Sequence, residues 1–192
     1  MAEPSIKGTL VQAAVSELRE LEQQGSVSRA ALERDLKPDD LELLDDDLLV
    51  SAWYPIASYG RMLEVIATAT GRNGDQDYVE TGRQSAQRLV EMGLYRQLDE
   101  RTAERWEERV GKLLLSVASL LWNFGGWEWL GMDETGFRIR FQGASPMPRS
   151  YALRTQGFVE YLAARAAGSP VRTQMQRSAD GNTLEFRCHK QL

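Results

Sequence analysis

The most informative pattern in the sequence lies in "GWEWLGMDETGFRIRFQG", residues 126–143. Within it, apolar side chains alternate with charged or small ones, first around Trp127 and Trp129 and again from Phe137 to Phe141. Alternation with a period of two is typical of a strand that has one buried face. The "DETG" segment between the two halves is typical of a turn. Residues 126–143 therefore predict a β-hairpin.

The residues that follow this hairpin predict a helix and a second hairpin. Residues 145–168 begin with prolines and end at Gly168, which is typical of helix boundaries. The last segment carries Asp180-Gly181 between two alternating stretches, and this dipeptide favours a hairpin turn. From residue 125 to residue 192 we therefore expect strand, strand, helix, strand, strand.

Helical periodicity dominates the chain before residue 125. The helices predicted from it cover residues 9–24, 55–71, 75–92 and 102–122. A short helix is also expected over residues 29–36, with Ser28 as its N-cap and Pro38 beyond its end. The acid-rich segment "PDDLELLDDDLLVSAW", residues 38–53, predicts a string of short turns. Residues 113–122 are apolar on nearly every side, which predicts a helix at the centre of the fold.

These patterns together predict an α+β fold. An N-terminal helical bundle, about residues 1–124, is followed by an antiparallel sheet of about four strands with one helix, residues 125–192. The length of 192 residues suits a single domain, 1–192.

Composition excludes several classes of protein. The chain is 42% hydrophobic and 27% charged, as in ordinary globular proteins, and its longest near-apolar run is too short to span a bilayer. The N-terminus lacks a secretory signal, and one cysteine allows no internal disulfide, so we expect a cytoplasmic location. The net charge is −5 and no nucleic-acid-binding motif is present, which argues against nucleic acid as a partner.

The charge is unevenly distributed along the chain. Residues 1–50 carry 5 basic and 12 acidic residues, a balance of −7. Residues 138–192 carry 9 basic and 3 acidic residues, a balance of +6. We therefore expect two faces of opposite sign, a feature that bears on partners or self-association.

Three stretches resemble a known family in their layout. They are "IKGTL" (6–10), "WYPIASYGRMLEVI" (53–66) and "VRTQMQRSADGNTLEFRC" (171–188). Together they are similar to an uncharacterised, myxobacteria-centred family of about 200 residues. That family is distantly similar to the ligand-binding fold of heme-NO-binding sensors, four-vinyl-reductase domains and TRAPP subunits. The resemblance implies an α+β fold with a hydrophobic cavity or groove between helices and sheet, and no assigned activity.

The chain departs from the cofactor-binding patterns of these relatives. Heme-NO-binding domains carry a proximal histidine on a helix and a Tyr-x-Ser-x-Arg cluster, and neither is present here. Four-vinyl-reductase domains usually have several cysteines near the terminal hairpin, and this chain has one. We therefore expect no cofactor.

Aromatic residues form the first candidate site. A pocket lined with aromatic rings is a common design for small-molecule binding, although such residues are also ordinary core residues. The candidate ligand cavity consists of Trp53, Tyr54, Trp122, Phe124, Trp127, Trp129 and Phe158.

Arginines on the non-core face of three predicted strands form the second candidate site. The candidate face for an anionic partner consists of Arg138, Arg140, Arg172 and Arg187. Long cationic side chains also protect exposed sheet faces and edges without binding a partner. The acidic residues of segment 38–53 similarly fit either helix starts on a solvated face or an interface with a basic partner.

The neighbouring residues Cys188 and His189 are the chain's only cysteine and histidine. Adjacent strand residues point to opposite faces, so we expect Cys188 in the core and His189 in solvent. A structural zinc site needs four ligands, and a catalytic Cys-His pair needs its two side chains in contact. We therefore predict no metal site and no catalytic residue here. No phosphate loop and no nucleophile elbow occurs elsewhere.

The sequence thus predicts a non-enzymatic module of a bacterial regulatory pathway. In one hypothesis it binds a small hydrophobic ligand in a helix/sheet cavity. In the alternative it is a protein-interaction adaptor that uses its acidic helices or arginine face, and a homodimer is expected by analogy with the fold relatives. A weaker third hypothesis is an enzyme that uses carboxylates.

Overall fold

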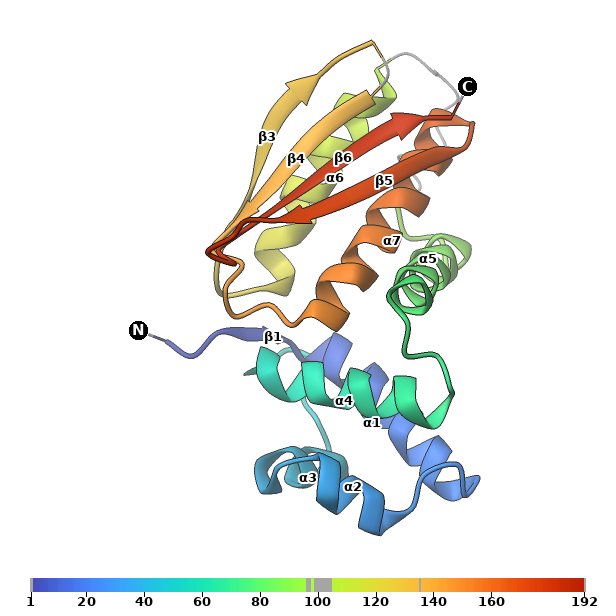
Figure 1. Ribbon diagram of the computed structural model, residues 1–192, viewed down its shortest axis with the longest axis vertical. Helices are drawn as coiled ribbons and strands as arrows, with labels where there is room; N and C mark the ends of the chain where they lie inside the picture. Colours follow the sequence, from blue (N-terminus) through green and yellow to red (C-terminus); the bar gives the residue numbers. More distant parts are fainter. Residues whose placement is uncertain (1, 96–97, 99–104, 135, 192) are drawn as a thin grey trace.

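The computed structural model describes residues 2–95, 98, 105–134 and 136–191. Helices make up most of the N-terminal part. They are α1 (Gly8–Gln23), α2 (Arg29–Asp35), α3 (Pro38–Asp45), α4 (Ile56–Ala69) and α5 (Asp75–Glu91). Helices α1 to α4 lie at one end of the molecule, and α5 runs beside the C-terminal part (Figure 1).

The C-terminal part is a four-stranded antiparallel sheet in the order β3-β4-β6-β5. Its strands are β3 (Gly126–Met132), β4 (Gly136–Gln142), β5 (Val171–Arg177) and β6 (Thr183–Lys190). Helices α6 (Trp106–Leu121) and α7 (Arg149–Ala167) cover one face of this sheet (Figure 1). The predicted α+β class and the strand, strand, helix, strand, strand order are confirmed.

A second, smaller sheet ties the start of the chain to residue 55. Strand β1 (Ser5–Lys7) pairs antiparallel with β2 (Trp53–Pro55), and Ile6 lies opposite Tyr54. Ile6 also forms a bridge to Trp122, so the first strand links the helical end to the sheet end. Sequence patterning did not predict these strands, because three residues are too few to show alternation.

The prediction of turns across residues 38–53 was partly wrong, because α3 is a helix. Pro38 occupies its first turn, and the buried carboxylate of Asp40 accepts the backbone N–H of Lys37 at 2.9 Å. Asp40 also accepts hydrogen bonds from Arg61 of α4 at 2.5 and 2.7 Å. This partly buried ion pair holds the short helix against α4.

The predicted central position of residues 113–122 also needs correction. Leu113, Leu114 and Trp122 are buried, but the side chain of Leu120 is 66% exposed. Helix α6 packs on the sheet and on α7, so its remaining side lies at the surface (Figure 1). None of the helices in the described ranges has the length and apolar character that a membrane crossing requires.

Helices α5 and α7 approach each other unusually closely, and two glycines allow this. A Cβ atom at Gly157 would lie 1.8 Å from the carbonyl oxygen of Val79. A Cβ atom at Gly82 would lie 2.0 Å from the carbonyl oxygen of Arg154. Only glycine fits at either position, and this crossing sets the distance between the two helices.

Candidate functional site

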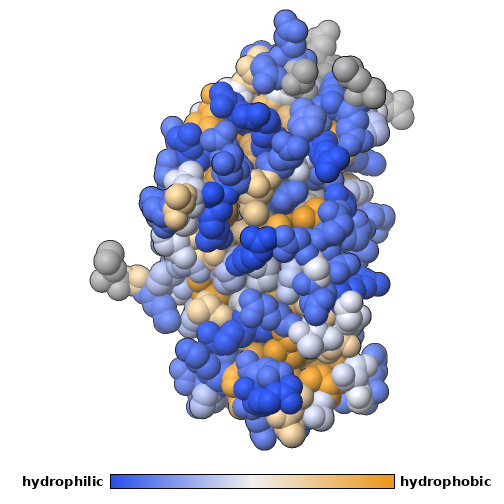
Figure 2. All heavy atoms as spheres, in the orientation of Figure 1, coloured by the Kyte–Doolittle hydropathy of each residue, from blue (hydrophilic) through white to orange (hydrophobic). Residues whose placement is uncertain are grey.

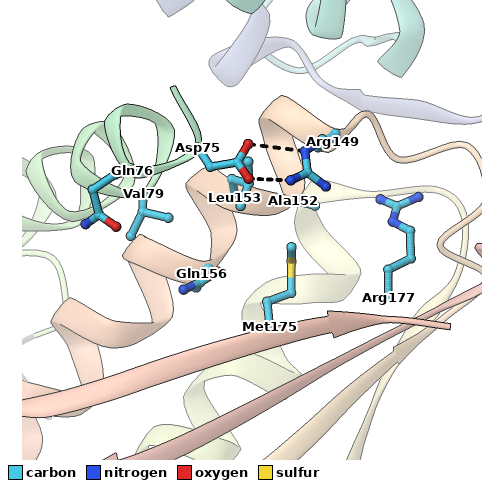
Figure 3. Close-up of a pocket in the computed structure, with 9 residues that line it drawn as sticks. All are labelled: Asp75, Gln76, Val79, Arg149, Ala152, Leu153, Gln156, Met175 and Arg177. Carbon is cyan, nitrogen blue, oxygen red and sulfur yellow. Dashed lines mark hydrogen bonds and ion pairs between the residues drawn. The ribbon is translucent and has the colours of Figure 1, made fainter. Parts of the chain in front are cut away.

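A pocket of about 320 Å³ lies between α5, α7 and the end of β5. Figure 3 shows its lining side chains converging from these three elements. The lining residues are Asp75, Gln76, Val79, Arg149, Ala152, Leu153, Gln156, Met175 and Arg177. A volume of this size falls in the range of small-molecule sites, which is roughly 300–1,000 Å³.

The start of two helices frames the mouth of the pocket. Asp75 is the first residue of α5, which follows the N-cap Gly74, and Arg149 is the first residue of α7, which follows Pro148. Arg149 donates from Nε and Nη2 to the two carboxylate oxygens of Asp75. The pair is largely exposed, so it joins the two helix ends at the surface without closing the pocket.

Arg177 contributes the second positive charge. It occupies the helix-facing side of β5, in register with the buried Val171 and Thr173 and the half-buried Met175. Its Nη2 donates to the carbonyl oxygen of Met147 at 2.8 Å, and it forms no ion pair with any residue that the structure describes. Burial, with the neighbouring charge of Arg149, lowers the pKa of Arg177 from its usual value. An arginine nevertheless stays protonated, so Arg177 is a partly buried cation without a counter-charge.

At the end of the pocket away from Arg177, polar side chains of α7 contact the free edge of β5. The backbone N–H of Thr173 donates to Oε2 of Glu160 at 2.6 Å, and its carbonyl oxygen accepts from Nε2 of Gln156 at 2.8 Å. Arg83 of α5 donates to Oε1 of Glu160 at 2.7 Å. These contacts satisfy backbone groups that an edge strand would otherwise expose, and they hold α5, α7 and β5 together.

The aromatic side chains predicted as a ligand cavity do not all meet. Trp122, Phe124 and Trp127 pack around Phe141, with ring centroids 5.5–6.0 Å from it, and Trp127 also contacts Phe186 at 5.2 Å. These are the separations of rings in direct contact, so this group forms part of the core. None of the predicted aromatic residues lines the pocket described above.

The remaining predicted aromatic residues lie in other places. Trp129 stacks on Phe137 with centroids 5.4 Å apart, and Phe158 packs edge to face on Tyr95. Trp53 is 41% exposed and lies under the ammonium group of Lys7. The neighbouring Tyr54 accepts the backbone N–H of Leu49 through its hydroxyl group.

The four arginines predicted as an anionic-partner face lie on the side of the sheet that α6 and α7 leave uncovered. Arg138 and Arg187 are directly opposite each other on β4 and β6. Arg138 and Arg140 lie 3.7 and 3.4 Å from Glu185, whereas Arg172 and Arg187 have no ion-pair partner in the described part of the chain. Hydrophilic residues dominate the molecular surface on the side shown in Figure 2.

The predicted separation of Cys188 and His189 is confirmed. Cys188 is 1% exposed, its Sγ accepts a hydrogen bond from the hydroxyl group of Thr173, and burial raises its pKa to about 12. His189 lies on the opposite face, across from Arg172, and is half-buried rather than fully in solvent. Within the described ranges, no three His, Cys, Asp or Glu side chains come together as metal ligands could.

Sequence reasoning missed the pocket because its charged residues are far apart in the chain. Asp75 is the first residue of α5 and Arg177 is the last residue of β5, and the packing of α5 on α7 brings both to one pocket. One signal could have found the site. Arg177 continues the alternation of Val171, Thr173 and Met175, so it places a cation on the core-facing side of a strand.

Comparison with known proteins finds the fold but no family. No family model and no curated protein matches the sequence. Several solved structures do match. One, from work probing the function of heme distortion in the H-NOX family, is 15% identical, with a TM-score of 0.59 and coverage of 97% of this chain and 95% of that chain.

Two further structures give the same result. An unliganded Fe(II) H-NOX protein mutant from K. algicida is 11% identical, with a TM-score of 0.64 and 97% coverage of both chains. A mutant of the T. tengcongensis H-NOX protein is 14% identical, with a TM-score of 0.59 and coverage of 97% and 98%. Similarity at this level concerns the fold alone. The chain therefore has an H-NOX-like α+β fold.

Proposed function

We propose that this protein is a non-enzymatic small-molecule-binding domain of a regulatory pathway, and that its ligand occupies the pocket between α5, α7 and β5. The observation that carries the proposal is the pocket itself. About 320 Å³ of space lies between a helix layer and a sheet, with polar groups from three elements converging over the apolar side chains of Val79, Leu153 and Met175. Convergent polar groups beside an apolar wall can bind and orient a small molecule.

This proposal differs from the expectation of a hydrophobic ligand among the aromatic residues. The rings of Trp122, Trp127 and Phe141 contact one another, whereas the pocket combines apolar and charged side chains. We therefore place the ligand at the pocket and assign the aromatic group to the core.

Heme bound through a histidine does not fit the residues present. The chain has one histidine, His189, and it lies on the outer face of β6 rather than on a helix. The place where helices and sheet meet is occupied by the rings of Trp122, Tyr151 and Phe141. The proposed function therefore includes no step that depends on heme.

The experiment uses methyl NMR of methionine residues with two small probes, hexanoate and hexanamide. Met175 lines the pocket, and the buried Met62 of α4 serves as an internal reference. We expect at least one probe to shift the Met175 methyl signal and leave Met62 unchanged. A Met175 signal that neither probe moves would overturn the proposal.

A pair of variants ties any such shift to the pocket. Ala152→Leu adds three carbon atoms to the pocket wall and is expected to abolish probe binding. Ala164→Leu makes the same change about three turns further along α7 and is expected to leave binding intact. Equal binding of the probe by both variants would show that it binds outside the pocket.

A specific observation favours docking of an acidic protein segment as a second candidate function. Like charges directly opposite each other on neighbouring strands destabilise a sheet, and Arg138 and Arg187 occupy such positions. Glu185 lies 3.7 Å from Arg138, whereas Arg187 has no ion-pair partner among the described residues, so a bound carboxylate would supply one to Arg187. We expect a labelled acidic peptide to bind the protein and to lose affinity in the Arg138→Gln/Arg187→Gln variant. The matched control is Arg34→Gln, since Arg34 pairs with Asp35 on α2.

Size-exclusion chromatography with light scattering tests the predicted homodimer.

A further inference from the structure

We propose that the pocket selects a small amphiphile that carries one carboxylate, with Arg177 as the residue that binds this group. The inference rests on the proposed function and adds the chemical class of the ligand. The apolar part of the ligand would lie on Met175 and Leu153, which both line the pocket. The carboxylate would lie on the Arg177 side, within reach of Arg149.

The hydrogen bonding of Arg177 is the first argument. A guanidinium group has five N–H donors in a planar fork that matches a carboxylate. Only Nη2 of Arg177 has a hydrogen-bond partner in the described structure, and that partner is the neutral carbonyl oxygen of Met147. The remaining donors face a pocket in which no described carboxylate pairs with them. Placing a cation on the helix-facing side of a strand costs free energy unless it gains a negative partner.

The charge balance of the pocket is the second argument. Its charged lining residues are Arg149, Arg177 and Asp75, which leaves one positive charge unbalanced. Asp75 is fully engaged, because both of its carboxylate oxygens accept from Arg149. A monoanion therefore neutralises the pocket, whereas a ligand with no charge leaves Arg177 uncompensated. Figure 3 shows the guanidinium group of Arg149 above the end of the Met175 side chain and that of Arg177 to the right of both.

The apolar lining is the third argument, and it separates an amphiphile from a free inorganic anion. Val79, Ala152, Leu153 and Met175 supply hydrocarbon on both the helix walls and the strand. A bare phosphate or chloride ion would leave this surface wet. An alkyl or aryl group beside the carboxylate would remove it from water, which is favourable by about 25 cal/mol per Å².

The test compares the affinities of hexanoate and hexanamide, which have similar sizes and different charges. In the unaltered protein we expect hexanoate to bind about tenfold more tightly, as a charge-assisted hydrogen bond provides. In Arg177→Gln the two affinities should become equal, and Arg177→Lys should keep part of the preference for hexanoate. The matched control is Arg172→Gln, which removes the same charge from the other face of β5 and should keep the full preference.

Asp75→Asn provides a test with the opposite sign. Asp75 competes with the ligand carboxylate for Arg149, so its neutralisation should raise hexanoate affinity by about two- to fivefold. A residue with a purely structural role would lower affinity or leave it unchanged when replaced. Circular dichroism melting curves check that each variant is folded.

The outcomes distinguish the inference from the proposed function. If both probes shift Met175 and hexanoate has no advantage that depends on Arg177, the carboxylate inference is overturned and the pocket remains a binding site. If neither probe shifts Met175, the proposed function itself fails. A hexanoate preference that Arg172→Gln removes as completely as Arg177→Gln would also contradict the inference, because it would reflect overall charge alone.

Discussion

The Gly157→Ala substitution is expected to push α5 and α7 apart and to destabilise the fold. The new Cβ atom would lie 1.8 Å from the carbonyl oxygen of Val79, 2.7 Å from its carbonyl carbon and 3.0 Å from the backbone nitrogen of Arg83. All three are backbone atoms, so no side-chain rotation can make room. Ordinary contact needs about 3.5 Å, and the helices must therefore separate by about 1.7 Å at this point.

The expected size of the effect comes from two opposing contributions. Alanine favours a helix interior over glycine by about 1 kcal/mol. Overpacking a well-packed contact costs roughly 1–3 kcal/mol, and a backbone clash of this depth belongs at the upper end. The net loss in the free energy of unfolding is then about 2 kcal/mol. For a chain of this length it corresponds to a fall in melting temperature of roughly 4–8 °C.

Urea unfolding, followed by tryptophan fluorescence, measures this loss directly. The Gly82→Ala variant should behave similarly, because its Cβ atom would lie 2.0 Å from the carbonyl oxygen of Arg154. One separation of the helices makes room for both methyl groups, so the double variant should lose less stability than the two single losses added. A Gly157→Ala protein that is as stable as the unaltered one, or more stable, would refute the close crossing.

Three further predictions concern the buried polar groups and heme. Burial alone would raise the pKa of Asp40, but hydrogen bonds from Arg61, Ser58 and the backbone of Lys37 outweigh it and the pKa is lowered. The ionised carboxylate therefore stabilises the fold at pH values above the pKa of Asp40 in the unfolded chain, which is about 3.9. This contribution to the free energy of unfolding is lost as the pH falls through the lower pKa that Asp40 has in the folded protein. Asp40→Asn should cost about 3 kcal/mol near neutral pH in urea unfolding, and an equal cost at strongly acidic pH would contradict this. Cys188, with a pKa of about 12, should resist a thiol reagent in the native protein and react once urea unfolds it, whereas fast native labelling would disprove its burial. Protein mixed with hemin should show no Soret shift typical of histidine ligation. Such a shift would contradict our conclusion that the residues present do not fit heme bound through a histidine.

Local patterns were enough to predict the sheet half of the fold. The alternation in β3, β4 and β6 and the helix boundary at Gly168 each depend on a few neighbouring residues, and the structure contains all of them. Strand alternation also separated Cys188 from His189 correctly. These features could be predicted because one buried face imposes a period that is visible in sequence.

Features that depend on contacts between distant segments could not be predicted in this way. The pairing of β1 with β2 joins three-residue segments whose side chains show no period. Helix α3 was hidden because its acidic residues are typical of turns, while its stability comes from the Asp40–Arg61 pair with α4. The pocket depends on the α5/α7 crossing, and glycines inside helical patterns, such as Gly82 and Gly157, were the one sequence sign of a close contact.

A crystal structure of the protein with hexanoate bound would show directly where the ligand lies. We expect the carboxylate within about 3.2 Å of the Arg177 guanidinium nitrogens and the alkyl chain against Met175 and Leu153. Hexanoate bound among Trp122 and Trp127, or on the outer face of the sheet at Arg187, would contradict it.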